Sequence, residues 1–265
     1  MLIDFHTHCF PDALAHRALE TLAYNCGGVE PICDGTLSGL RESMRRDGVD
    51  VSVVLNIATN ARQQHKVNDF ARETCAPDIV GFGSVFPDAE DALDEIDRIA
   101  DMGLQGIKLH PEFQNFFVDD PKMKPLYRKI SRRGLILTFH SGKDDGYPSP
   151  VHCTPERLAR ALQWLDTPVV AAHWGARGME DEVLEHLCGR DVYLDTAYSY
   201  GAAVKPMLIK ILEKHGTDKV LFATDSPWQS ARNQLRQVDT LGLTPQEREK
   251  LLFRNALRLL GRPEP

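Results

Sequence analysis

Eight short runs of apolar and β-branched residues alternate with longer amphipathic stretches along this 265-residue chain. Most of these runs are almost continuously apolar, as expected of parallel strands that are covered on both faces. The predicted strands are residues 2–8, 51–58, 79–87, 104–111, 135–142, 168–175, 191–199 and 219–227. The predicted helices include 91–103, 154–166, 179–189 and 244–261, which have a boundary glycine, an opening Thr-Pro pair, or both.

This regular alternation of strand and helix favours a closed (β/α)₈ barrel over an open sheet. The length agrees, because such a barrel typically needs about 250 residues. No glycine-rich dinucleotide fingerprint follows the first predicted strand, which argues against a nucleotide-binding open sheet. We therefore predict one TIM-barrel domain over residues 1–265, with residues 11–48 forming loops and a helix across its mouth.

The composition argues against several other classes of protein. The net charge is −7 and there is no basic run, so nucleic-acid binding is disfavoured. No stretch approaches the roughly 20 apolar residues of a membrane span, and cleavage of a signal peptide would remove the first predicted strand. Scattered cysteines without a Cys-x-x-Cys pair indicate reduced thiols and a cytoplasmic protein. They are Cys9, Cys26, Cys33, Cys75, Cys153 and Cys188.

Polar side chains gather where the predicted strands end. Five of the ten histidines lie at these ends, and the eighth strand ends with a carboxylate. In a barrel the carboxyl ends of the strands meet at one mouth, where barrel enzymes hold their active sites. His6 and His8 are two residues apart, so they share one face of their strand. Burying several unpaired polar groups costs several kcal/mol, and a divalent metal would offset that cost. The residues expected at the mouth are His6, His8, Lys108, His110, His140, His173 and Asp225.

These strand ends resemble the motifs of the amidohydrolase superfamily, and most closely its amidohydrolase-related branch, which includes the aminocarboxymuconate semialdehyde decarboxylase type. The matching segments are DFHTH, GIKLHP, FHSG, AHWG, ATDSPW and RNALRLLG, which together span residues 4–261. The resemblance implies a distorted barrel with one divalent metal, commonly zinc, although manganese, iron or cobalt also suits such donors. It implies that His6, His8, His140 and Asp225 bind the metal. It further implies that Asp225 accepts a proton and that His173, a catalytic residue but not a ligand, assists the metal-activated water.

Two relatives of this pattern are disfavoured. In the binuclear branch of the superfamily, a carbamylated lysine in the fourth strand bridges two metals. Lys108 lies in that strand, but its Lys-x-His-Pro context favours a single metal, with Lys108 and His110 as walls or substrate contacts. TatD-type nucleases share the opening His-x-His but have glutamates at later strand ends, whereas the fourth strand here ends in Lys108, Leu109 and His110.

A metal-activated water at this mouth suits two reactions. Its attack on the carbonyl of a small cyclic ester or amide, such as a lactone, gives hydrolysis. Its addition to a conjugated ring or chain prepares the loss of CO₂ from an aromatic or muconate-type acid. The chain is short for a decarboxylase, which favours hydrolysis. A non-catalytic barrel is the remaining alternative, and it is disfavoured because no ligand position is missing.

The substrate contacts expected from the sequence are few. Arg177 is the candidate partner of a substrate carboxylate, and Trp174 and Trp228 are candidate aromatic walls. We expect a small-molecule substrate as the partner, and a homodimer as the default assembly.

Overall fold

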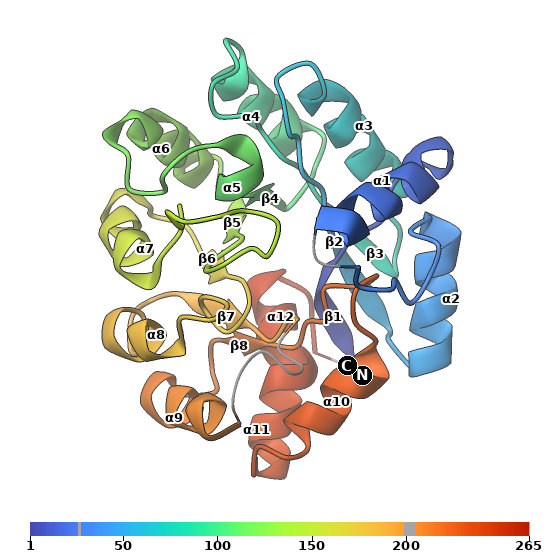
Figure 1. The fold of residues 1–265 in the computed structure, drawn as a ribbon, viewed down its shortest axis with the longest axis vertical. Helices are drawn as coiled ribbons and strands as arrows, with labels where there is room; N and C mark the ends of the chain where they lie inside the picture. Colours follow the sequence, from blue (N-terminus) through green and yellow to red (C-terminus); the bar gives the residue numbers. More distant parts are fainter. Residues whose placement is uncertain (26–27, 199–204, 265) are drawn as a thin grey trace.

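The computed structural model describes residues 1–25, 28–198 and 205–264. All eight predicted strands are present, and each is shorter than predicted because pairing stops before the polar residues that follow most of them (Figure 1). Ser199, which ends the seventh predicted strand, and Cys26 lie outside the described residues. The strands are β1 (Ile3–Thr7), β2 (Val51–Leu55), β3 (Ile79–Phe82), β4 (Gly106–Leu109), β5 (Ile136–Phe139), β6 (Val169–Ala171), β7 (Tyr193–Asp195) and β8 (Val220–Leu221).

The strands are parallel and follow one another in chain order. They form two sheets, β1-β2-β3 and β4-β5-β6-β7-β8. A few backbone hydrogen bonds connect the two sheets at each edge. Among them, Gly83 donates to the carbonyl of Gly106 and Phe5 donates to the carbonyl of Phe222, both at 2.9 Å. The fold is therefore the predicted (β/α)₈ barrel, closed by short irregular contacts.

Apolar side chains from opposite strands fill the interior of the barrel. Phe5, Phe82, Val170 and Leu221 belong to one contiguous buried cluster. A second, larger cluster lies largely between the strands and the surrounding helices. The packed interior closes the barrel below its mouth, so only the carboxyl ends of the strands are left to form a cavity.

Helices surround the barrel (Figure 1). The predicted helices 91–103, 154–166 and 179–189 are confirmed as α4 (Ala92–Asp101), α7 (Pro155–Ala161) with η2 (Leu162–Trp164), and α8 (Glu180–His186). Further helices around the barrel are α3 (Gln64–Thr74), α5 (Pro111–Gln114), η1 (Pro121–Met123), α6 (Lys124–Arg132), α9 (Lys205–His215) and α10 (Ala231–Val238).

The predicted C-terminal helix is interrupted. It starts at a Thr244 capping box as α11 (Pro245–Glu249), widens into a π-helical segment, η3 (Lys250–Arg254), and ends as α12 (Asn255–Leu259). The carbonyl of Leu251 accepts a hydrogen bond from the backbone N–H of Phe222 at 2.9 Å. Because this carbonyl accepts a hydrogen bond from outside the helix, the regular hydrogen bonding of the helix is interrupted here, which accounts for its local widening.

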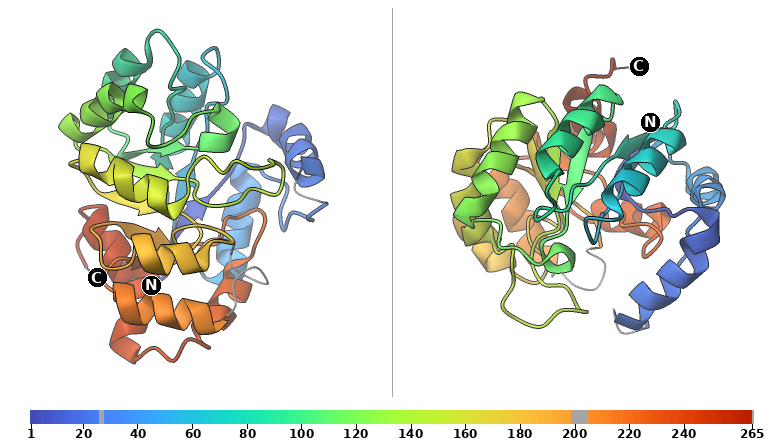
Figure 2. Two further views of the ribbon diagram at one scale, coloured as in Figure 1. Left: turned by 60° about the vertical axis from the view of Figure 1, so that its left-hand side comes forward. Right: turned by 90° about the horizontal axis from the view of Figure 1, so that it is seen from above.

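Residues 11–48 form two helices where one was expected, α1 (Asp12–Asn25) and α2 (Leu37–Asp47). The right-hand view of Figure 2 shows both termini at one end of the barrel, with α1, α5 and the loop after β5 at the other. Helix α1 is thus the element that lies across the mouth, as predicted. None of the helices in the described ranges combines the length and apolar character required to cross a bilayer.

Candidate metal centre and active site

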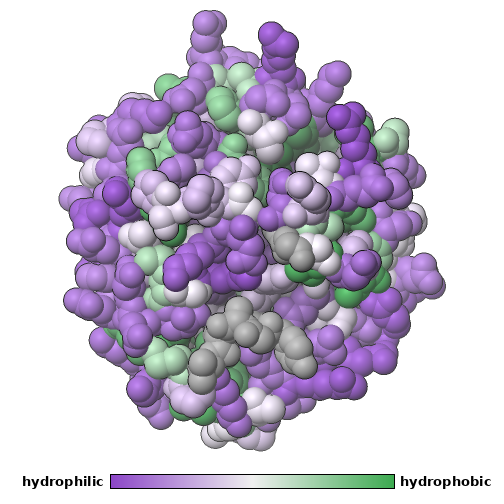
Figure 3. Space-filling view, viewed as in Figure 1, coloured by the Kyte–Doolittle hydropathy of each residue, from purple (hydrophilic) through white to green (hydrophobic). Residues whose placement is uncertain are grey.

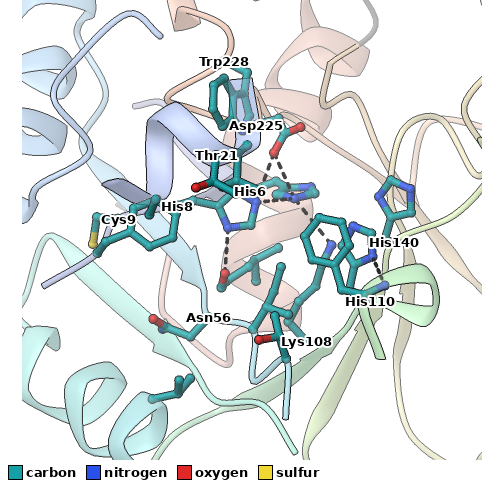
Figure 4. A pocket seen from close by; sticks show the side chains of 18 of the residues that line it. His6, His8, Cys9, Thr21, Asn56, Lys108, His110, His140, Asp225 and Trp228 are labelled. Carbon is teal, nitrogen blue, oxygen red and sulfur yellow. Dashed lines mark hydrogen bonds and ion pairs between the residues drawn. The ribbon is translucent and has the colours of Figure 1, made fainter. Parts of the chain in front are cut away.

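The two histidines of β1 turn the same ring nitrogen toward each other. His6 Nε2 and His8 Nε2 are 3.2 Å apart (Figure 4). His8 Nδ1 is 2.8 Å from the carbonyl of Leu55, and His6 Nδ1 is 2.9 Å from Asp195 Oδ2. Because a carbonyl and a carboxylate can only accept, both Nδ1 atoms carry the proton, and both Nε2 atoms present lone pairs.

Asp225, which follows the neighbouring strand β8, completes this group from the other end of the chain. Its Oδ1 atom is 3.1 Å from His8 Nε2 and 3.4 Å from His6 Nε2. Its backbone is left-handed, with φ of 68°, and its N–H donates to the carbonyl of His6 at 2.8 Å. Burial alone would raise the pKa of Asp225, but its electrostatic interactions with His6 and His8 outweigh burial and hold the pKa well below its usual range. The carboxylate is therefore ionised.

These three donor atoms fit a divalent cation. With bonds of about 2.0–2.1 Å, the ligands of tetrahedral zinc lie about 3.3 Å from one another, and the three separations here are 3.1, 3.2 and 3.4 Å. Two lone pairs and a carboxylate oxygen with no proton between them repel one another, so the arrangement is favourable only around a positive charge. His6, His8 and Asp225 are accordingly one of the clusters able to hold a metal.

Burial keeps four of the imidazoles at this mouth neutral at neutral pH. It lowers the pKa of His6, His110 and His140 well below the ordinary 6.5, and also lowers that of His173. Metal ligation requires neutral imidazole, so at neutral pH these rings need not lose a proton before binding. Burial also lowers the pKa of Lys108 to about 8.

His140, the third predicted nitrogen ligand, is placed apart from the first three donors. Its Nδ1 atom is 3.1 Å from His173 Nε2, and its buried Nε2 atom has no hydrogen-bond partner in the described part of the chain. It clusters instead with His110 and Asp144. His173 is fixed by its Nδ1 atom, which donates to the carbonyl of Ala197 at 3.1 Å. Three of the four predicted ligands thus converge, and the role of His140 stays a prediction.

Lys108 and His110 lie on the β4 side of the group. Lys108 Nζ is 3.5 Å from His6 Nε2. The ring of His110 is stacked between those of His140 and Phe113, with centroid separations of 4.1 and 3.6 Å. His110 also caps α5, because its Nδ1 accepts the N–H of Phe113 at 3.4 Å. Stacking and capping together hold this imidazole rigidly at the edge of the site.

One cavity of about 710 Å³ is lined by all seven residues expected at the mouth: His6, His8, Lys108, His110, His140, His173 and Asp225. Arg177 and Trp228 line it as well. The guanidinium of Arg177 pairs with Asp145 at 2.6 Å and lies 4.7 Å from the ring centroid of Tyr198. The cavity is large enough for a drug-sized ligand, and its polar groups are concentrated at the carboxyl ends of the strands.

Comparison with protein families agrees with this arrangement. The amidohydrolase family model (Amidohydro_2) matches residues 3–262. The chain belongs to the amidohydrolase family. Members of this family are metal-dependent enzymes, and hydrolases and decarboxylases are found among them. A search of curated protein sequences finds no match.

Solved structures similar to this amidohydrolase share its fold at low sequence identity. An uncharacterised TIM-barrel protein from Bordetella bronchiseptica has 23% identity and a TM-score of 0.78, with 98% of each chain covered. The 5-carboxyvanillate decarboxylase LigW from Sphingomonas paucimobilis has 18% identity and a TM-score of 0.73, with 99% of each chain covered. A candidate 2-pyrone-4,6-dicarboxylic acid hydrolase from Pseudomonas putida has 20% identity and a TM-score of 0.68, with 98% of this chain and 97% of that chain covered.

One predicted wall of the amidohydrolase site lies elsewhere. Trp174 is 1% exposed, belongs to the hydrophobic core and does not line the cavity. The prediction assumed an extended strand through residue 175, but β6 ends at Ala171, and His173 and Trp174 have left-handed backbones with φ of 60° and 56°. His173 lines the cavity, whereas Trp174 is packed inside the protein.

Two carboxylates of the amidohydrolase site were not predicted from the sequence. Asp195 is fully buried at the end of β7, where it accepts hydrogen bonds from His6 Nδ1 and from the backbone N–H of His173 at 2.8 Å. Its position at a strand end was the signal that could have found it. Asp144 lies 3.5 Å from His110 Nε2, in the loop after β5, and no spacing rule points to it.

Proposed function

We propose that this amidohydrolase is a metal-dependent hydrolase of a small cyclic ester or amide, such as a lactone. The observation that carries the proposal is the convergence of His6 Nε2, His8 Nε2 and Asp225 Oδ1 within 3.4 Å of one another, in the wall of a cavity. We propose zinc as the ion. The donor set also tolerates manganese, iron or cobalt, and His140 is the proposed fourth ligand.

A divalent cation, when bound, supplies Lewis acidity and lowers the pKa of water from 15.7 toward about 7. The remaining chemistry belongs to the side chains. The ionised Asp225 carboxylate accepts a proton from the attacking water and later returns it to the leaving group. His173, held by the carbonyl of Ala197 through Nδ1, presents an unprotonated Nε2 atom that orients the water as an acceptor, and it stabilises the developing oxyanion once Nε2 has taken up a proton.

The charge of the cavity supports an acid as substrate or product. Cationic side chains outnumber carboxylates among its described lining residues, although the whole chain carries a net charge of −7. Such a local excess of positive charge concentrates anions. The residues concerned are Arg17, Lys66, Lys108 and Arg177 on the cationic side, and Asp144 and Asp225 on the anionic side.

A second candidate is non-oxidative decarboxylation of a small aromatic or muconate-type acid. It is favoured by the position of Arg177 on the cavity wall beside the Tyr198 ring, where a flat carboxylate would find both a cation and an aromatic face. Chain length does not argue against it, because the match to the decarboxylase from Sphingomonas paucimobilis covers 99% of both chains. Loss of CO₂ from such acids is therefore the second reaction to assay.

The first experiment measures metal content and turnover together. Elemental analysis of the protein as isolated should find about one divalent ion per chain, and a strong chelator should remove both activity and part of the thermal stability. A panel of lactones, assayed by acid release, is compared with aromatic and muconate acids, assayed by CO₂ release. Acid release without CO₂ release supports hydrolysis. CO₂ release alone would replace hydrolysis by decarboxylation as the proposed function. If neither panel reacts, the remaining hypothesis is a barrel without catalytic activity.

Two variants separate the roles of the neighbouring histidines. His140→Ala should lose metal, whereas His173→Ala should keep it and lose turnover. The reverse result would overturn both assignments. We further propose a cytoplasmic protein that uses neither nucleic acid nor a membrane as a partner, with a homodimer as the default assembly.

A further inference from the structure

Helix α1 carries one broad apolar face. Ala15 and Leu19 on this face are buried against the body of the protein. Leu14, Ala18 and Leu22 recur at intervals of four residues beside them, and all three line the cavity, so they form the cavity-facing edge of the apolar face, the α1 stripe. Leu14 is 56% exposed. Packing against the barrel accounts for the buried part of the face and leaves the exposed Leu14 edge unexplained.

The same stretch of cavity has further apolar residues on its other sides. Val67 and Phe70 of α3 and Phe10 of the loop after β1 line it together with the α1 stripe. We call this group, Phe10, Leu14, Ala18, Leu22, Val67 and Phe70, the apolar annex. Figure 1 shows α1 and α3 over the β2 and β3 side of the barrel, away from β5 and β6, which lead into His140 and His173.

Annex and metal centre are parts of one cavity. Thr21 of α1 lines the same cavity as His8 and Trp228 (Figure 4), so the helix that carries the apolar stripe also borders the space in front of the metal ligands. On the surface, Figure 3 shows hydrophobic side chains on the right of the mouth, where α1 and the segment after it lie. Arg17, Thr21, Gln63 and Lys66 line the cavity beside the annex. Apolar walls next to polar and charged groups suit an amphiphilic small molecule.

We propose that the apolar annex binds a hydrocarbon tail of the substrate, so that the substrate is an amphiphile whose ester, lactone or acid head lies at His6, His8 and Asp225. This inference rests on the proposed function for the head group and adds the chemistry of the remainder of the molecule. Burial of a tail removes from water both the tail and the Leu14 face, which the protein otherwise leaves exposed.

The size of the effect follows from the hydrophobic contribution of a methylene. Each fully buried methylene improves affinity about fourfold, and a partly buried one about twofold. The affinity of straight-chain carboxylates should therefore rise two- to fourfold per carbon from butanoate onward, then level off once the tail extends beyond the annex.

The experiment measures binding of butanoate, hexanoate, octanoate and decanoate to the full-length protein by calorimetry. It compares the wild type with Leu14→Asp, which places a charge in the annex, and with Leu93→Asp as a matched control. Leu93 is 42% exposed on α4 and does not line the cavity. Asp is well tolerated in the first turn of a helix, and thermal melting confirms that each variant folds.

We expect a chain-length dependence in the wild type and in Leu93→Asp, and its loss in Leu14→Asp, in which the four carboxylates should bind equally. Equal affinities along the series, or the same dependence in Leu14→Asp, would refute the annex. Dissociation of a dimer by Leu14→Asp, seen by size-exclusion chromatography, would instead assign the α1 face to a second copy of the chain and would also refute it.

Turnover tests the head group separately. γ-Lactones with side chains of one to six carbons should show a KM that falls with length and a nearly constant kcat. A protein that binds long carboxylates but opens no lactone would keep the annex and reject the proposed hydrolysis. One that opens lactones with a KM independent of length would do the opposite.

Discussion

Replacing Asp195 with asparagine should weaken metal binding about 10- to 100-fold while the barrel stays folded. Asp195 accepts hydrogen bonds from His6 Nδ1 at 2.9 Å, from the His173 N–H at 2.8 Å and from the Ala197 N–H at 3.0 Å. An amide has the same shape as the carboxylate, but only one of its two ends can accept. The substitution therefore preserves the packing and changes the position of one proton.

The preferred orientation of the amide follows from the three donors. If its NH₂ group faced the two backbone N–H groups, two buried donors would lose their acceptor at about 1–3 kcal/mol each. The amide oxygen therefore stays on the backbone, and the NH₂ group faces His6 Nδ1. That nitrogen must then accept, which moves the ring proton to Nε2, the atom that faces His8 and Asp225. A protonated Nε2 atom cannot bind a metal.

A 10- to 100-fold loss corresponds to about 1.4–2.7 kcal/mol. It is measured by titrating wild type and Asp195→Asn with zinc in the presence of a competing chelator, with Asp191→Asn as control. Asp191 lies four residues earlier, and its side chain is 92% exposed. Wild-type zinc affinity in a folded Asp195→Asn protein would show that the tautomer of His6 is not set by Asp195, and the positioning argument would be wrong.

Two further predictions concern stability. Burial raises the pKa of Glu112 from the ordinary 4.5 to about 7, so between these values the folded state holds a proton that the unfolded state has lost, and stability falls as pH rises through that window. The free energy of unfolding of Glu112→Gln, measured by urea titration relative to wild type, should rise by up to about 3 kcal/mol between acid pH and pH 8. A difference in unfolding free energy that does not change with pH would contradict the assignment. Trp174→Ala should lower the free energy of unfolding by about 3–5 kcal/mol because it empties a core position, and a Trp174→Ala protein of wild-type stability would refute the placement of Trp174 in the core. Trp228→Ala should chiefly raise KM.

The barrel could be predicted from the sequence because its signal is repeated and local. Each strand is a buried apolar run, and eight such runs with intervening helices leave few alternative folds. The convergence of His6, His8 and Asp225 was predictable for the same reason, since strand order brings the carboxyl ends to one mouth. The interruption of the C-terminal helix was not, because it depends on a carbonyl of Leu251 that faces the backbone of Phe222, a contact between segments far apart in the sequence.

Side-chain direction beyond the last paired residue was the part that sequence reasoning could not supply. The alternation rule holds only while the backbone is extended, and it fails at His173, Trp174 and Asp225, where φ is positive. A left-handed backbone is costly for residues other than glycine and is retained where surrounding bonds enforce it; here the N–H groups of His173 and Asp225 are held by Asp195 and by the carbonyl of His6. The backbone strain at His173 and Asp225 therefore lies at residues that are proposed to be catalytic. Trp174 points into the core because it directly follows His173.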